Sequence, residues 1–192
     1  MKPEFDIEDI KEAVEVLKAG GIILYPTDTV WGIGCDATSE SAVAKVFELK
    51  KRSDSKSLIT LVSDADMLGR YVKVIPEVAI NLIEVNDKPM TIIYPGAMNL
   101  ASNVIAEDGS VGIRIPMNDF CVELIRRFRK PIVSTSANIS GEPTPSSYEE
   151  ITFDIINSVD WVADPCLEEG STGKSSQIIK VGLHGEIEIL RS

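Results

Sequence analysis

The chain has 192 residues, close to the usual size of one domain, so we expect one folded unit over residues 1–192. Its hydrophobic content of 44% and its charged content of 26% are typical of globular proteins in water. No apolar run approaches the roughly 20 residues that cross a bilayer, which argues against a membrane-spanning protein. The net charge of −11 opposes non-specific nucleic-acid binding, because that affinity depends on Lys and Arg displacing counterions.

Residues 1–11 are acidic and helix-patterned, without the basic start and apolar stretch of a secretory signal, so we expect a cytoplasmic protein. The three cysteines, Cys35, Cys121 and Cys166, are widely spaced, and His184 is the only histidine. This set supports neither a disulfide framework nor a metal held by protein side chains. A single histidine also argues against Ser-His-Asp or Cys-His catalysis, which needs an imidazole beside the nucleophile.

The first half of the chain alternates helical and strand patterns. Apolar residues at three- and four-residue spacing indicate the first helix, which Gly20 and Gly21 end. A short apolar strand follows and stops at Pro26. In chain order, we expect a helix over 7–18, a strand over 22–25, a helix from Ser39 or Ser41 to Leu49, and a strand over 58–62.

The second half continues the alternation and ends in a hairpin turned at Leu183, His184 and Gly185. Helices interleaved with strands predict an α/β fold with a twisted sheet of mixed direction, flanked by helices. In chain order, we expect a helix at 80–84, strands at 91–94 and 111–115, a helix at 121–129, a strand at 132–134, a helix around 148–156, and strands at 161–163, 177–181 and 186–190.

The turn after the first strand carries Thr27, Asp28 and Thr29, followed by Gly32 and Gly34. Hydroxyls and a carboxylate after a buried strand are suited to a pocket mouth, and glycines let the backbone approach a ligand. The alternative is a structural turn held by Asx or Ser/Thr hydrogen bonds. These residues alone leave both interpretations open.

A cluster of four cations, Lys50, Lys51, Arg52 and Lys56, follows the second helix. Cations near a helix C-terminus gain from the macrodipole, so simple capping and a solvated face would explain them. In an acidic protein, the same cluster is suited to a triphosphate, because Arg offers a planar fork and Lys a point charge.

Arg114 lies in the run from Ser110 to Pro116, where it alternates with Val111, Ile113 and Ile115. The period of two in a strand puts Arg114 on the face opposite these apolar side chains. If that face meets solvent, Arg114 has no special role. If the face lines a cavity, Arg114 is a site for a carboxylate or another anion.

The stretch over 130–145 leads from an apolar strand into a polar loop. Its hydroxyls, its amide and its backbone N–H groups are suited to phosphate and to base edges, more than a plain loop requires. The residues that carry this pattern are Ser134, Thr135, Ser136, Asn138, Ser140 and Thr144. Neither GxxxxGK[ST] nor a GxGxxG after a strand is present, so any ATP site uses another arrangement.

Five motifs in this order resemble the YrdC-like threonylcarbamoyl-AMP synthase family: PTDTVWGIG, KKR, YPGAMN, SVGIRIP and STSANISG. The resemblance covers essentially the whole chain and matches the short, single-domain members. It implies a twisted α/β sheet curved around a large, positively lined cavity. It also implies an enzyme that forms threonylcarbamoyl-AMP and pyrophosphate from L-threonine, bicarbonate and ATP, with Mg²⁺ carried on ATP, for modification of a tRNA adenosine.

Site residues follow from the resemblance position by position. Lys50 and Arg52 would be catalytic, and Ser53, Ser57 and Leu61 depart from residues common in the family. Positions that match the family's threonine site are Thr29, Lys50, Arg114 and Ser134. Positions that match its nucleotide site are Arg52, Lys56, Ser110, Ser136, Asn138, Thr144 and Arg191.

Two other interpretations stay open at this point. The chain could be a YciO-like or HypF-like enzyme that handles a different carbamoyl adenylate. It could instead be a double-stranded RNA-binding module without catalysis, although an acidic chain with Trp31 and Trp161 far apart offers neither a basic stripe nor a stacking platform. Contact with tRNA, the oligomeric state and the transferase protein that would receive the product do not follow from the sequence.

Overall fold

The computed structural model describes residues 5–51 and 58–192. The helices are α1 (Ile7–Lys18), α2 (Glu40–Leu49), α3 (Ala65–Leu68), α4 (Glu77–Val85), α5 (Asp119–Phe128) and α6 (Phe153–Ile156), with 3-10 turns η1 (Tyr148–Glu150) and η2 (Pro165–Glu168). The strands are β1 (Ile23–Pro26), β2 (Trp31–Gly34), β3 (Ile59–Leu61), β4 (Met90–Tyr94), β5 (Val111–Arg114), β6 (Ile132–Ser136), β7 (Trp161–Val162), β8 (Gln177–Val181) and β9 (Ile187–Arg191).

Within these residues the strands form one sheet in the order β7-β1-β2-β6-β3-β5-β4-β8-β9. The sheet contains both parallel pairs (β1 with β7, β3 with β5, β4 with β8) and antiparallel ones, so the expected mixed direction is confirmed. Strand β6 pairs with β2 on one side and with β3 on the other, which joins the two halves of the sheet. The expected C-terminal hairpin is present as β8 and β9.

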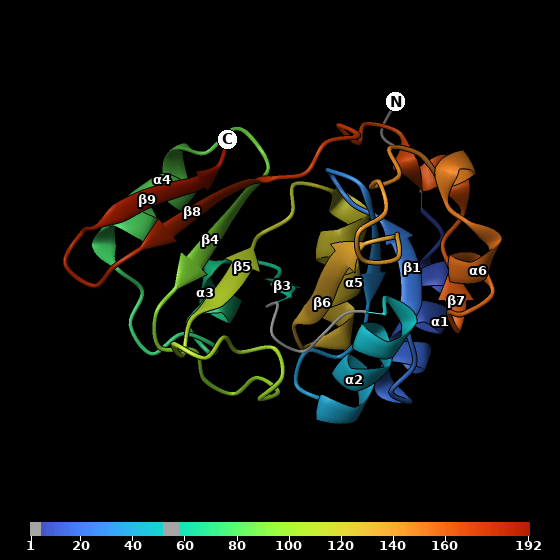
Figure 1. Ribbon diagram of the computed structural model, residues 1–192, viewed down its shortest axis with the longest axis horizontal. Coiled ribbons are helices and arrows are strands. Elements are labelled where there is room, and N and C mark those ends of the chain that lie inside the picture. Colours follow the sequence, from blue (N-terminus) through green and yellow to red (C-terminus); the bar gives the residue numbers. More distant parts are fainter. Residues whose placement is uncertain (1–4, 52–57) are drawn as a thin grey trace.

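The helices divide between the two halves (Figure 1). α1, α2 and α5 gather around β1, β2 and β6, whereas α3 and α4 accompany β4, β5, β8 and β9. Helix α1 illustrates why the sequence folds this way, because Asp6 caps its N-terminus by accepting from the N–H of Glu8. Its apolar stripe is buried, and α1 packs against α5.

One expected element differs in the structure, and two elements were not expected. The segment expected to be one helix at 148–156 is η1 followed by α6, and the two are separated at Ile151 and Thr152. The Gly-containing turn after Pro26 includes a strand, β2, which pairs with both β1 and β6. Helix α3 has only four residues, and its pattern did not stand out in the sequence.

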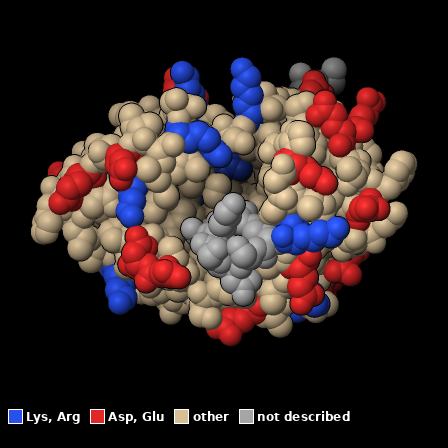
Figure 2. All heavy atoms as spheres, in the orientation of Figure 1, with Lys and Arg blue, Asp and Glu red and all other residues tan. Residues whose placement is uncertain are grey.

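In the part of the chain that the structure describes, no helix is both long and apolar enough to cross a membrane. The surface is hollowed between the two halves of the molecule (Figure 2), and Lys and Arg side chains lie at the upper edge of the hollow. The fold therefore places a cavity where β6 joins the two halves, as the resemblance implied.

Candidate active site

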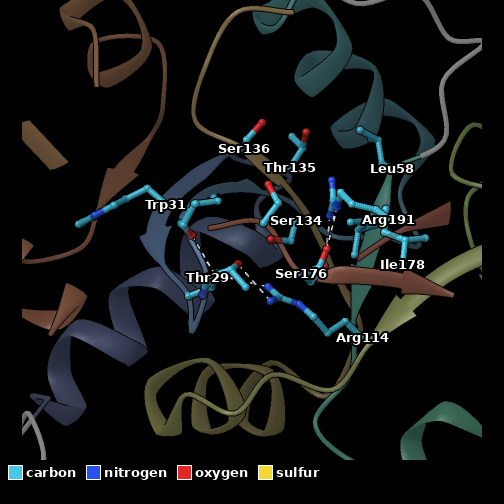
Figure 3. A pocket seen from close by; sticks show the side chains of 15 residues that line it. Thr29, Trp31, Leu58, Arg114, Ser134, Thr135, Ser136, Ser176, Ile178 and Arg191 are labelled. Atoms are coloured by element: carbon cyan, nitrogen blue, oxygen red, sulfur yellow. Dashed lines mark hydrogen bonds between the residues drawn. The ribbon is translucent and has the colours of Figure 1, made fainter. Parts of the chain in front are cut away.

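A cavity of about 250 Å³ lies between the two halves of the sheet. One wall comes from the turn between β1 and β2 and from the end of β6, and the other comes from β3, β5, β8 and β9 (Figure 3). Five of the predicted site residues line it: Thr29, Arg114, Ser134, Ser136 and Arg191. Segments far apart in the sequence thus bring two guanidinium groups and a set of hydroxyls to one place.

Arg114 is the most constrained cation of this cavity, with an exposed fraction of only 4%. Its Nη1 lies 3.2 Å from Asp28 Oδ1 and donates to Thr29 Oγ1 at 3.1 Å, and its Nη2 donates to Thr27 Oγ1 at 3.3 Å. Arg114 Nε has no hydrogen-bond partner among the described residues. The strand face that carries Arg114 therefore lines a cavity, which decides between the two alternatives left open by the sequence.

Asp28 balances this buried charge from the far side of the arginine. Its side chain is 9% exposed, and its Oδ2 accepts from the backbone N–H of Met117 at 3.3 Å. A buried cation without a counter-charge would be strongly unfavourable. The negative charge of Asp28 therefore offsets the desolvation cost of burying Arg114. The carboxylate thereby serves the arginine, and Asp28 does not itself line the cavity.

The hydroxyl of Thr29 has a defined orientation. Thr27 Oγ1 donates its one proton to the carbonyl of Val30 at 2.8 Å. The 2.8 Å contact between Thr27 Oγ1 and Thr29 Oγ1 must then use the proton of Thr29. Thr29 Oγ1 accepts from Arg114, so this network holds the guanidinium in one plane at the cavity wall.

Gly32 and Gly34 allow close approach of protein groups rather than of a ligand alone. A Cβ at Gly34 would come within 2.7 Å of the carbonyl oxygen of Val133, and a Cβ at Gly32 within 2.9 Å of Ser134 Oγ. The glycines thus let β2 pack closely against β6 and leave room for the Ser134 hydroxyl at the cavity. Gly32 also lines the cavity, so its expected role in ligand approach stays a prediction.

Arg191 enters the cavity from the opposite wall (Figure 3) and is held more loosely than Arg114. Its Nε donates to the carbonyl of Ser176 at 2.7 Å and its Nη2 to Ser176 Oγ at 3.4 Å. Ser176 Oγ is also 2.8 Å from Thr91 Oγ1. Desolvation, and then the charge of Arg114, lower the pKa of Arg191, so an anion between the two guanidinium groups would relieve their repulsion.

Ser175 and Ser176 line the same cavity and were missed in the sequence. They belong to a loop that crosses the turn after β1, where the N–H of Thr172 donates to the carbonyl of Asp28 and that of Gly173 to the carbonyl of Thr29. The signal available in the sequence was the small polar run over 170–176 directly before an apolar strand, which resembles the segment after β6.

Lys50 is buried beside the cavity but does not line it. Its Nζ donates to the carbonyls of Ser136 and Asn138 at 2.5 and 2.7 Å, and its own carbonyl accepts from the N–H of Ser140 at 2.9 Å. Lys50 therefore orders the end of β6 and the loop after it. Its predicted catalytic role remains a prediction.

The remaining nucleotide residues are spread over the neighbourhood. Ser110 lines an adjacent cavity of about 560 Å³, which shares Leu58, Ile59 and Ile178 with the first. Its Oγ donates to Asp108 Oδ1 at 2.5 Å. Asn138 and Thr144 lie in the loop after β6 and line neither of these cavities, while Arg52 and Lys56 lie outside the described residues.

The chemistry available here is electrostatic rather than nucleophilic. Burial raises the pKa of the Cys35 and Cys121 thiols well above neutrality, so neither is a thiolate at neutral pH. Over residues 5–51 and 58–192, no group of three or more His, Cys, Asp or Glu residues is arranged to hold a metal ion. Two guanidinium groups with hydroxyls between them are suited to carboxylate and phosphate groups held side by side.

Comparison with known proteins identifies relatives over most of the chain. The family model Sua5_yciO_yrdC, described as telomere recombination, matches residues 15–192. A protein of Enterobacter sp. (strain 638) named threonylcarbamoyl-AMP synthase is 34% identical over 154 residues, which are 79% of this chain and 81% of the relative.

Two solved structures share the fold. P. abyssi Sua5 complexed with L-threonine has a TM-score of 0.86 and 28% identity, and the match covers 94% of this chain but about half, 53%, of that one. E. coli YciO has a TM-score of 0.81 at 23% identity over 98% of this chain and 91% of its own. The extent of the family match and the identity to the Enterobacter protein show that this chain belongs to the Sua5/YciO/YrdC family.

Proposed function

We propose that this protein is a threonylcarbamoyl-AMP synthase, which forms threonylcarbamoyl-AMP and pyrophosphate from L-threonine, bicarbonate and the magnesium complex of ATP. The observation that carries the proposal is the pairing of Arg114 and Arg191 across one hydroxyl-lined cavity. Such a site suits a substrate carboxylate and a phosphate in contact. The name of the Enterobacter relative and the threonine bound to P. abyssi Sua5 support the same assignment.

In the proposed reaction, the amine of threonine captures bicarbonate to give a carbamate and releases water. A carbamate oxygen then attacks the α-phosphorus of ATP, the bond from that phosphorus to the β-phosphate oxygen breaks, and pyrophosphate leaves. The two reacting groups are both anionic, so the enzyme must hold them together against repulsion. Orientation of this kind supplies roughly 7–11 kcal/mol in favourable intramolecular reactions.

The threonine end of the site is assigned to Arg114, Thr29 and Ser134. Arg114 would bind the amino-acid carboxylate, because its guanidinium is already aligned by Asp28, Thr27 and Thr29. A guanidinium ordered before binding loses little freedom when the ligand arrives. The Ser134 hydroxyl can accept from the amine or donate to the carboxylate, whereas Thr29, whose proton goes to Thr27, acts through Arg114.

The nucleotide end is assigned to Arg191, Ser136 and the adjacent cavity that Ser110 lines. Arg191 would meet the phosphate that carries the reacting bond and offset the charge that builds there. Lys50 would act through the carbonyls of Ser136 and Asn138, because it orders the loop that follows β6. Arg52, Lys56, Asn138 and Thr144 stay assigned to ATP, and tRNA and a transferase protein stay assigned as later partners.

Pyrophosphate release tests this proposal against an enzyme for another carbamoyl adenylate. We expect release with ATP, Mg²⁺, bicarbonate and threonine, much less with serine, and none without an amino acid. Equal release with all three mixtures would favour a YciO-like or HypF-like activity. Binding of double-stranded RNA without any ATP turnover would favour the RNA-binding alternative, and its strength should then fall steeply with salt.

A further inference from the structure

One carboxylate away from the cavity joins three separate segments of the chain. Glu168 Oε2, in η2, accepts from Trp31 Nε1 at 2.6 Å and from the backbone N–H of Tyr148 at 2.8 Å. The rings of Trp31 and Tyr148 also contact each other, with centroids 5.0 Å apart. We call these three residues the Glu168 clasp.

The clasp holds the far end of the polar loop that follows β6. The near end is held by the same tryptophan, because the backbone carbonyl of Trp31 accepts from the N–H of Ala137 at 3.1 Å. Both ends of the segment 137–148 are therefore attached to Trp31, one directly and one through Glu168. Trp31 is 1% exposed and lies in β2, a strand in the interior of the sheet, so it is a rigid anchor.

The loop between these two anchors carries residues that the proposed function assigns to ATP. Inside it, Asn138 Nδ2 donates to the carbonyls of Ile139 and Glu142, which folds the loop on itself. Buried Asn138 Oδ1 has no hydrogen-bond partner in the described part of the chain. A loop closed at both ends holds this acceptor, and Thr144 beyond it, in one arrangement.

Of the three clasp residues, Trp31 lines the cavity that holds the two arginines, whereas Glu168 and Tyr148 do not. The Trp31 ring points away from Arg114 and Arg191 (Figure 3). Glu168 lines neither the cavity that holds the two arginines nor the adjacent one. Any effect of Glu168 on a ligand must therefore pass through Trp31 and through Tyr148 at the end of the loop.

We propose that Glu168 is a positioning residue for nucleotide binding, whose carboxylate orders the loop over 137–148 through Trp31 and Tyr148. This inference rests on the proposed function for its effect on ATP, but the ordering of the loop does not depend on activity. The acceptor oxygen, rather than the negative charge, is the group that matters. Glutamine in place of Glu168 keeps an oxygen that can accept both hydrogen bonds.

Hydrogen exchange of the ligand-free protein tests the ordering directly. In Glu168→Ala, we expect amides over 138–148 to exchange about tenfold faster, because one acceptor shared by two donors is lost. Glu168→Gln should restore slow exchange. Glu169→Ala is the matched control, because it removes a neighbouring exposed carboxylate. Unchanged exchange in Glu168→Ala would overturn the proposal whether or not the protein proves to be a synthase.

Kinetics then test the link to the nucleotide. We expect Glu168→Ala to raise KM for ATP about tenfold while kcat and KM for threonine change little, and we expect the loss to be much smaller in Glu168→Gln. Trp31→Phe should raise KM for ATP in the same direction, and combining it with Glu168→Ala should add little. A tenfold fall of kcat in Glu168→Ala, with KM for ATP unchanged, would contradict the proposal.

Discussion

Arg114 and Arg191 face the same cavity, but the structure treats them differently. Arg114 is buried, and its charge is matched by Asp28 and aligned by two threonine hydroxyls. Arg191 is exposed at the end of edge strand β9, and its guanidinium donates to the carbonyl and hydroxyl oxygens of Ser176. One wall of the site is therefore ordered before a ligand arrives, whereas the other can adjust to it.

This difference predicts that the two arginines contribute differently to ligand binding and to the stability of the folded protein. A side chain that is held by other protein groups contributes to the stability of the folded state as well as to ligand binding. Its loss therefore lowers both. A group near solvent contributes mainly when a ligand is present. Substitutions at the two arginines should therefore give different ratios of stability loss to activity loss.

The largest effect is expected at Arg114. Arg114→Ala leaves the Asp28 carboxylate buried without its counter-charge, which should lower the free energy of unfolding by about 3–5 kcal/mol. Denaturant unfolding measures this loss. A decrease under about 1 kcal/mol would show that the pair is not important for stability.

Arg114→Lys examines the activity of the same position without removing the charge. Lysine cannot reproduce the planar fork that meets Thr27 and Thr29, so kcat/KM for threonine should fall roughly 10²–10³-fold. Threonine-dependent pyrophosphate release measures it. Turnover near that of the unmodified protein would mean that Arg114 is not the carboxylate site.

The second effect is expected at Lys50, whose Nζ satisfies two carbonyls of the β6 loop. Lys50→Met fills similar space but removes the donor from the carbonyl of Asn138 and one of two donors from that of Ser136, which also accepts from the N–H of Asn138. This loss should lower the free energy of unfolding by about 1–3 kcal/mol. KM for ATP should rise as well, because the loop loses its order. Thermal unfolding and ATP saturation curves measure the two effects, and exposed Lys45→Met serves as a control.

Arg191→Gln should affect ligand binding alone. Because Arg191 is exposed, the free energy of unfolding should change by no more than about 0.5 kcal/mol. KM for ATP should rise about tenfold, equivalent to about 1.4 kcal/mol of binding. A stability loss as large as that of Arg114→Ala would remove the distinction between the two walls.

The smallest effect concerns the rim of the adjacent cavity. The Ser110 hydroxyl and then Lys180 lower the pKa of Asp108 to about 2 from its ordinary 3.8. The contribution of ionised Asp108 to the stability of the folded state is therefore complete above pH 3.8 and is lost as the pH falls toward 2. Unfolding curves across this window should show a smaller pH slope in Asp108→Asn. An equal pH slope of the unfolding free energy in Asp108→Asn and in the unmodified protein would contradict this role of Asp108.

Sequence patterns correctly predicted the helices and strands that are stabilised by residues close to them in the chain. The apolar spacing of α1 and the Ser39 cap of α2 were correct because caps and stripes act within a few residues. Strand β2 was missed because the two glycines of Trp-Gly-Ile-Gly weaken its strand propensity, and the strand forms through pairing on both sides. The helix expected at 148–156 is interrupted at Ile151 and Thr152, whose backbones are extended, and no local pattern in the sequence indicated this break.

The site was predicted unevenly for the same reason. The period of two placed Arg114 opposite its apolar neighbours, but only the fold shows that this face lines a cavity. The pairing of Asp28 with Arg114 spans 86 positions of the chain, and no local pattern announces it. Glu168 gains its contacts only after distant segments meet, so its residue type gave no signal.

The most direct test is mass spectrometry of the products formed from ATP, Mg²⁺, threonine and bicarbonate labelled with carbon-13. We expect threonylcarbamoyl-AMP that carries the label, formed by the unmodified protein and strongly reduced in Arg114→Lys. A labelled product in the absence of threonine, or equal yields from the two proteins, would contradict the assignment of Arg114 and its cavity to this reaction.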